Sequence, residues 1–139
     1  MAVAGETKYH PGDIISMKAT ADITKGQVVK LTGSREVQPA SAKDDPAIGV
    51  ALKDISNGDY GDIQVLGAVY VVANGAISVG AFCVPSTTAG RVEAKKTAAE
   101  GAGAVTVETV IGQALEAASA AGDVILMLLV HFADKDTGT

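Results

Sequence analysis

The sequence predicts an all-β fold, a small barrel or sandwich built from a unit that occurs twice. Segments rich in β-branched residues recur about once every ten residues and are bounded by Gly, Asn, Asp or Pro, which is typical of strands joined by tight turns. Hydrophobic residues make up 47% of the 139 residues but aromatic residues only 4%. The core must therefore be filled by small aliphatic side chains. The third observation is an internal repeat between residues 23 and 129.

The repeat consists of similar blocks that keep their order. Its offset is 54 at the first block and 63 at the third, as expected where the loops between matched blocks differ in length. We therefore predict quasi-repeats at about 23–67 and 77–129, inside a single β domain that spans residues 13–131. The matched blocks are Ile23–Val29 with Ile77–Cys83, Arg35–Val37 with Arg91–Val92, Ile48–Leu52 with Ile111–Leu115, and Gly61-Asp62 with Gly122-Asp123.

The strands follow one another along this domain, and each flank has a different composition. Residues 1–12 contain Pro11-Gly12 and show no periodicity, which is typical of an extended arm. Residues 132–139 have the composition of a flexible C-terminal tail. Strands are expected near 13–18, 27–32, 35–38, 47–52, 62–66, 68–73, 81–85, 91–94, part of 105–117, and 123–131.

One segment gives conflicting signals. Residues 97–122 are rich in Ala, and by propensity alone Val110–Ala121 would form a helix. The repeat favours a strand at 110–116, because this segment matches a block of the first copy in which Gly and β-branched residues suit a strand. One or two short helical turns, at Glu116–Ala120 and Lys53–Asn57, remain compatible with the pattern.

Charge and hydrophobicity exclude several classes of partner. The net charge of −5 and the scattered basic residues argue against a nucleic-acid partner. The longest apolar run, Val124–Val130, is far shorter than the roughly 20 residues of a membrane helix. That run is apolar on both strand faces, so we expect burial on both sides, with the core on one side and either the same domain or a neighbouring subunit on the other. The N-terminus does not resemble a secretion signal.

No constellation of reactive residues is apparent, so we predict no enzyme, no cofactor and no metal. His10 and His131 lie far apart near opposite ends of the chain. Cys83, the single cysteine, sits in an apolar strand pattern and is expected to be a small buried hydrophobe, as in a protein made in a reducing compartment. The acidic turns Lys43–Pro46 and Asn57–Asp59 lack the spacing of a calcium loop.

The order of the blocks resembles the tailed-phage head-decoration proteins, also called capsid cement proteins. The residues that carry the resemblance are the Ile-x-x-Gly-x-Val-Val-Lys-Leu run from Ile23, the Arg-Glu-Val-Gln-Pro-Ala run from Arg35, the block Ile48–Leu52, and the Gly-Asp-Ile-x-Val-x-Gly run from Gly61, with a looser second copy. The resemblance implies a small, mainly β, non-enzymatic structural protein. Proteins of this kind trimerise on the outer surface of the phage head and often extend an N-terminal arm across capsid subunits.

The resemblance implies a location and partners. The chain would be made in the host cytoplasm and placed on the outer capsid surface of the virion, where it would stabilise the head. Its partners would be the major capsid protein and further copies of itself in a homotrimer, with no nucleic acid and no membrane. Within the arm, Tyr9, His10 and Pro11 are the candidate capsid contacts.

Three alternatives stay open at the level of sequence. A duplicated β unit is also compatible with a ligand-binding module without catalysis, although the lack of Trp weakens the case for a sugar ligand. An enzyme of unrecognised type is the second alternative. The third concerns residues 1–12, which have the composition of a plain disordered terminus as well as that of a capsid-binding arm.

Overall fold

The computed structural model describes residues 3–5, 12–95 and 107–135, and these residues form ten strands and no helix. The prediction of an all-β fold is therefore confirmed, and each predicted strand is present. The strands are β1 (Ile14–Ala19), β2 (Val28–Gly33), β3 (Glu36–Pro39), β4 (Ala47–Ala51), β5 (Tyr60–Gln64), β6 (Gly67–Asn74), β7 (Phe82–Pro85), β8 (Val92–Ala94), β9 (Val107–Ala114) and β10 (Ala121–Lys135).

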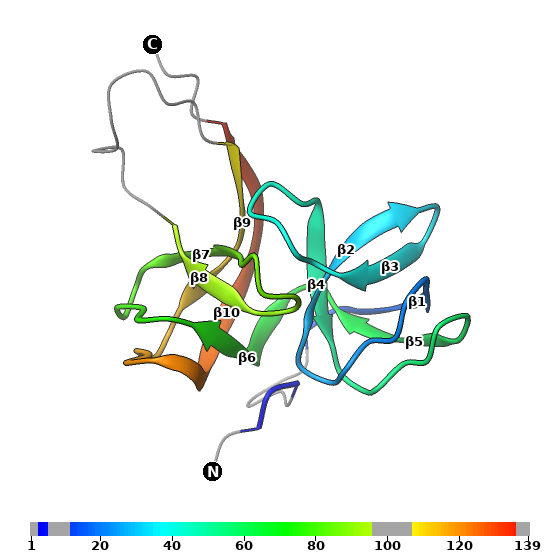
Figure 1. Cartoon of the computed structure of the whole chain (residues 1–139), viewed down its shortest axis with the longest axis horizontal. Coiled ribbons are helices and arrows are strands. Elements are labelled where there is room, and N and C mark those ends of the chain that lie inside the picture. Colours follow the sequence, from blue (N-terminus) through cyan, green and yellow to red (C-terminus); the bar gives the residue numbers. More distant parts are fainter. Residues whose placement is uncertain (1–2, 6–11, 96–106, 136–139) are drawn as a thin grey trace.

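The strands close into two five-stranded barrels. Barrel 1 has the strand order β1-β3-β2-β4-β5, and barrel 2 has the order β10-β6-β8-β7-β9. The barrels lie side by side, with β4 next to barrel 2 (Figure 1). Only Val65 and Leu66 separate β5 from β6. Closure of both sheets leaves few unpaired strand edges, which in an open sheet would invite aggregation.

Both barrels have the same topology, which is consistent with the duplication. In each, the first strand is parallel to the third: Ala19 on β1 faces Val37 on β3, and Ala73 on β6 faces Val92 on β8. The first strand is also antiparallel to the fifth and so closes the barrel, β1 with β5 and β6 with β10. A parallel contact between the first and third strands is the feature that joins each hairpin-rich unit into a barrel.

The matched block at Ile23 and Ile77 forms the same turn in both barrels. The Gly26 amide donates to the Ala51 carbonyl and the Gly80 amide donates to the Ala114 carbonyl, at 2.8 Å in each case. Gly26 and Gly80 have φ values of 91° and 85°, which side chains with a Cβ rarely adopt. The repeated glycine is therefore required by the turn.

The match between the two Gly-Asp pairs is wrong by three residues. Gly58 and Gly122 are the structural equivalents, at an offset of 64. Gly58 precedes the last strand of barrel 1 and Gly122 lies at the start of the last strand of barrel 2, with φ values of 92° and 95°. Gly61 instead lies within β5, where an added Cβ would contact the side chain of Ile55. The first copy contains two Gly-Asp pairs, and the sequence does not indicate which one makes the turn.

The Ala-rich segment follows the repeat and not its helix propensity. Residues 110–114 lie in β9, and no helical turn forms at 116–120 or at 53–57. Those two connections instead make single antiparallel bridges, Ile23 with Ile55 and Ile77 with Ala118. Tertiary pairing on both sides of β9, with β7 and β10, outweighs the few tenths of a kcal/mol per residue that separate these residues' helix propensities.

The apolar core is divided into two clusters, and barrel 1 contributes to both. Val28 and Val29 are adjacent and fully buried, but Val29 belongs to the cluster inside barrel 1 and Val28 to the cluster of barrel 2. Val50 and Ala51 divide between the clusters in the same way. Because neighbouring strand residues point to opposite faces, β2 and β4 are buried on both sides. Barrel 2 covers the outer face of barrel 1.

The apolar run of β10 is only partly buried on its second face. The side chains of Ile125, Met127 and Leu129 are buried in the core of barrel 2. On the other face Leu126 is buried but Leu128 is 37% exposed. Within one copy of the chain, the second side of the run is therefore open at Leu128, and its burial against a neighbouring subunit stays a prediction. The double-sided burial occurs instead in β2 and β4.

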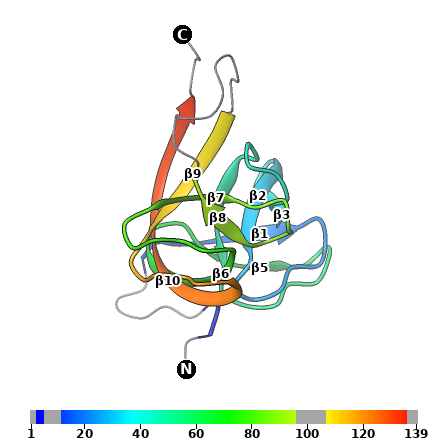
Figure 2. The ribbon, with the colours of Figure 1, turned by 60° about the vertical axis from the view of Figure 1, so that its left-hand side comes forward.

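The backbones of β9 and β10 continue beyond barrel 2. After a bulge between Leu129 and Phe132, the register runs from Phe132 opposite Val110 to Lys135 opposite Val107. Figure 2 shows these ends as a two-stranded ribbon that projects from the barrel. Strand β10 thus extends past both ends of the predicted 123–131.

Candidate functional site

The described N-terminal residues lie against both barrels. The Gly5 amide donates to the Tyr70 carbonyl of β6 at 2.9 Å. On barrel 1, Gly26 has no room for a Cβ because Ala4 lies against it. At the other end of the segment, Gly12 packs against the backbone of Leu66 in the connection between the barrels. The N-terminal segment is thus fixed to the body before and after residues 6–11.

The candidate capsid contacts Tyr9, His10 and Pro11 lie outside the described residues. Their role therefore stays a prediction. The described anchors at Gly5 and Gly12 were not apparent from the sequence, since neither glycine belongs to a repeated block. The signal that was available is the Gly at both positions, which permits close approach of a second backbone.

The contact between the barrels is formed by backbone hydrogen bonds. The Val28 amide donates to the Gly90 carbonyl at 2.9 Å, and the Gly90 amide donates to the Ala40 carbonyl at 2.8 Å. Further along, the Thr109 amide donates to the Lys43 carbonyl at 2.8 Å. Together with the shared apolar cluster, these bonds join the two barrels.

An ion-pair cluster closes one side of this contact. The Lys43 ammonium lies 3.1 Å from a Glu93 carboxylate oxygen and 3.9 Å from Glu108. The Glu108 side chain is only 4% exposed, whereas Lys43 and Glu93 are about a quarter exposed. One lysine from barrel 1 thus neutralises part of the charge of two carboxylates from barrel 2. The Lys43 turn is a structural element of the contact.

Reactive chemistry is not favoured at the thiol. Cys83 is buried in barrel 2, and burial raises its pKa to about 12, only slightly offset by a hydrogen bond with the backbone of Ala114. A thiol with so high a pKa is protonated at neutral pH and is a poor nucleophile. Among the described residues, no group of three or more His, Cys, Asp or Glu side chains could hold a metal ion. The described part of the chain also contains no helix that could span a membrane.

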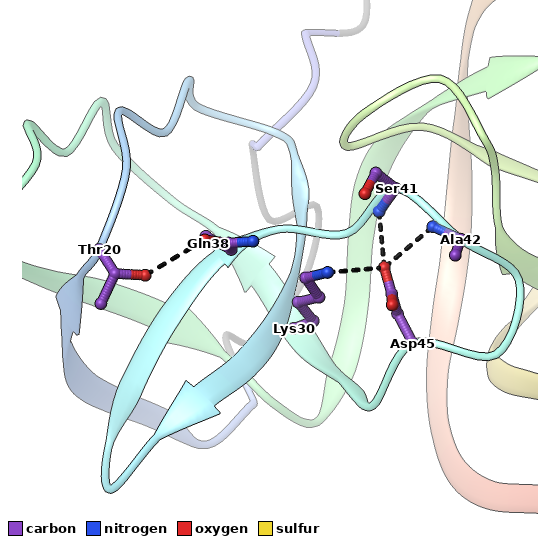
Figure 3. A network of polar contacts seen from close by, with 6 residues as sticks. All are labelled: Thr20, Lys30, Gln38, Ser41, Ala42 and Asp45. Carbon is purple, nitrogen blue, oxygen red and sulfur yellow. Dashed lines mark hydrogen bonds and ion pairs between the residues drawn. The ribbon is translucent and has the colours of Figure 1, made fainter.

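The acidic turn at 43–46 has a structural role. The Asp45 carboxylate accepts hydrogen bonds from the Ser41 and Ala42 amides at 2.8 and 2.9 Å, and Lys30 lies 3.3 Å from the same oxygen (Figure 3). Burial raises the pKa of Asp45, but the hydrogen bonds and the lysine charge outweigh burial and hold this pKa below its ordinary value of 3.8. The Asp45 carboxylate thus stabilises the loop in which it lies.

This arrangement predicts a pH-dependent effect of Asp45→Asn. Because the folded pKa is depressed, the ionised carboxylate stabilises the fold above the unfolded pKa, and this contribution is lost as the pH falls through the folded pKa. We expect the variant to melt a few degrees below wild type at pH 7, and the difference to shrink as the pH falls below 3.8 and through the lowered folded pKa. Asp44→Asn, which removes an exposed charge next to it, is the control in thermal melts from pH 2.5 to 7. A difference that persists at low pH would contradict the assignment.

Exposed apolar side chains gather on one part of barrel 2. Val79 is 66% exposed, Leu115 43%, Phe82 42% and Leu128 37%. Phe82 and Leu128 both lie opposite Gln113 in the sheet. Val79 and Leu115 are next in sequence to Gly80 and Ala114, which are joined by a backbone hydrogen bond. We call these four side chains and Gln113 the barrel-2 face. Sequence analysis did not identify it, because alternation along a strand does not tell whether an outer face is covered.

Comparisons with known proteins place the chain in a family. Residues 9–129 match the model of a family described as phage cement protein. The comparison with curated proteins gives no match. Among solved structures, the crystal structure of the head fibre gp8.5 N base of bacteriophage phi29 is similar, with a TM-score of 0.62 at 19% sequence identity over 89% of this chain and 98% of that chain. This likeness shows a shared fold. The resemblance seen in the sequence is thus confirmed, and the chain belongs to the family of phage cement proteins, which are structural proteins associated with the phage head.

Proposed function

We propose that the protein binds the outer surface of a tailed-phage capsid as a homotrimer and stabilises the head, without catalysis. The observation that carries the proposal is the family match over residues 9–129, which includes both barrels. The partner is the major capsid protein. The similar phi29 structure is by its title the base of a head fibre, which supports a location on the head.

The structure supports this proposal through rigidity. Two closed barrels share an apolar cluster and are joined by backbone hydrogen bonds, so their surfaces keep one relative position. A protein that braces a shell needs such a body, because each contact it makes then resists displacement of the subunits beneath it. Many copies on one shell need only modest affinity each, since several simultaneous contacts per trimer multiply their effect.

We further propose that residues 1–12 act as an arm that contacts capsid subunits through Tyr9, His10 and Pro11. Support comes from the described residues on either side, because Gly5 and Gly12 both contact the body. The family match also begins at residue 9, within the predicted arm.

The test compares three proteins in co-sedimentation with undecorated heads: wild type, a deletion of residues 2–11, and the triple variant Tyr9→Ala, His10→Ala, Pro11→Ala. The triple variant is the sharper probe, because it keeps Val3–Gly5 and their bond to Tyr70. We expect both variants to fold, with the melting temperature of the triple variant unchanged, and head binding to weaken at least about tenfold, which corresponds to about 1.4 kcal/mol.

Unchanged binding by the triple variant would remove these three side chains from the mechanism, and unchanged binding by the deletion would remove the whole arm. Wild-type protein that does not bind heads at all would contradict the proposed function. Head stabilisation is measured separately, as the temperature at which heads with and without bound protein lose their integrity. Equal temperatures would contradict a stabilising role.

A further inference from the structure

The duplication allows one barrel to be used as a guide to the other. In barrel 1, Val28 on β2, Val50 on β4 and Gln64 on β5 are consecutive partners across the sheet. All three are fully buried, and Val28 and Val50 belong to the cluster of barrel 2. This row is thus the surface on which barrel 1 receives another barrel.

The equivalent row of barrel 2 is Phe82, Gln113 and Leu128, which are consecutive partners across β7, β9 and β10. The equivalence follows from the shared topology, at the offsets of 54, 63 and 64 that relate the two barrels. Phe82 and Leu128 keep 42% and 37% of their surface exposed. Contiguous patches of exposed apolar side chains often mark interaction sites, whereas single exposed apolar side chains are common on any protein surface.

The turn beside the row shows the same contrast. Gly26 in barrel 1 is buried, with Ala4 against it, whereas Gly80 in barrel 2 is exposed and an added Cβ there would meet no atom within 4 Å. Val79 and Leu115 flank this open turn and are exposed. The same part of the unit is covered in barrel 1 and open in barrel 2.

The polar member of the barrel-2 face is partly satisfied within its own barrel. Gln113 donates through Nε2 to the Gly80 carbonyl at 3.0 Å. Burying a polar group that lacks a partner costs roughly 1–3 kcal/mol, and this cost is avoided for that N–H. A partner that covers the face therefore needs to offer hydrogen bonds only to the Oε1 atom and the second N–H of this amide.

We propose that the barrel-2 face binds a second copy of this chain and forms the contact between subunits of the trimer. The inference rests on the homotrimer of the proposed function. The occupant is argued from the repeat: the corresponding row of barrel 1 is covered by a barrel of the same unit, so the open row suits a barrel of the next copy.

The repeat also indicates the segment of the next copy that meets this face. Barrel 1 is covered by the end of the 86–90 loop, where the buried Gly90 bonds to Val28 and Ala40. Val37 and Val92 occupy the same position in the two barrels, at an offset of 55, so the structural equivalent of Gly90 is Arg35, and the sequence match of Arg35 with Arg91 is one residue off. Arg35 is the described non-glycine residue with a positive φ, at 55°. The segment Leu31–Arg35 is exposed throughout. A cyclic trimer requires two different complementary patches on each copy, and this turn is the second patch.

The test uses the full chain with the paired substitution Leu115→Lys and Leu128→Lys, and Tyr60→Lys as the matched control on barrel 1. Tyr60 is 64% exposed, against 43% for Leu115 and 37% for Leu128, so the control adds a charge at a more open apolar site on the other barrel. Sedimentation velocity over a range of concentrations measures association, a thermal melt checks folding, and co-sedimentation with undecorated heads measures capsid binding.

We expect wild type and Tyr60→Lys to form a trimer, and the paired variant to fold but sediment as a 13.9 kDa monomer with at least tenfold weaker head binding. A paired variant that still forms trimers overturns the inference and leaves the trimer itself in place. If it forms trimers but no longer binds heads, the face contacts the capsid protein instead, which also overturns the inference. A wild type that remains monomeric both free and on heads overturns the proposed trimer.

A cross-link tests the second patch. Leu115→Cys combined with Ser34→Cys should join copies through a short bismaleimide, whereas Leu115→Cys with Tyr60→Cys should not, and the buried Cys83 stays unreactive in both. Equal yields from the two pairs would overturn the β2–β3 turn as the contacting segment. If the thermal melt shows that the paired lysine variant does not fold, the milder pair Leu115→Gln with Leu128→Gln is used in its place. This pair must also dissociate the trimer.

Discussion

Alanine at position 49 is expected to lower the free energy of unfolding by about 3 kcal/mol, at the upper end of what overpacking costs. Gly49 is buried in the middle of β4, between β2 and β5. An added Cβ would overlap the Gln64 carbonyl oxygen and lie 2.9 Å from the Ile63 Cγ2 atom. Because the nearest group is backbone in a closed barrel, it can move only if the sheet opens.

Gly33→Ala is the control for this change. Gly33 also lies in a strand of barrel 1, as the last residue of β2, but an added Cβ there would meet the carboxylate end of Glu36, which is flexible and can turn away. We expect a change of less than about 0.5 kcal/mol. Urea unfolding of wild type and both variants measures the difference. Equal stability of the two variants would mean that β4 and β5 are not as closely paired as described.

Lys43→Met is expected to destabilise the fold by about 2 kcal/mol, because it leaves two carboxylates facing one another without their cation. Removing one partner from a fully buried ion pair costs about 3–5 kcal/mol. The lower value applies because Lys43 and Glu93 are about a quarter exposed and solvent screens part of the interaction. Methionine preserves the aliphatic stem, so the loss reports charge more than packing.

Lys53→Met provides the contrast. Its ammonium is 4.0 Å from the Asp62 carboxylate, and the two side chains are 73% and 46% exposed. We expect an effect below about 0.5 kcal/mol. Both variants are measured by urea unfolding at low and high salt. A Lys43→Met effect as small as that of Lys53→Met would show that the 43/93/108 cluster does not secure the contact between the barrels.

The internal repeat was the most accurate guide to the fold. It predicted a strand at 110–116 against the helix propensity of the Ala-rich segment, and residues 110–114 lie in β9. It did so because two copies that share a topology must share strand pairings, whereas propensity reports only the isolated backbone. The repeat failed at Gly61, where similarity of two residues was mistaken for the same turn, and only the positive φ of Gly58 distinguishes them.

The sequence does not indicate which outer strand faces are covered. Val28-Val29 and the run 124–130 both read as strands apolar on both sides. The first is buried on both sides, inside barrel 1 at Val29 and against barrel 2 at Val28, whereas the second leaves Leu128 exposed. The alternation of apolar and polar residues predicts which residues of a strand point into its barrel. Whether the outward-pointing residues are covered depends on how the two barrels pack, and no local sequence pattern indicates that. The barrel-2 face was missed for this reason.

The covered row of barrel 1 also has a consequence for synthesis. Strand β5 closes barrel 1 and ends at Gln64, before β6 begins at Gly67, so all five strands of barrel 1 leave the ribosome before those of barrel 2. At that stage Val28 and Val50 still face water on a finished barrel. Domains generally fold in the order in which they are made. The first barrel is therefore the template on which the nascent second barrel condenses, and its row is an aggregation-prone surface for as long as translation continues.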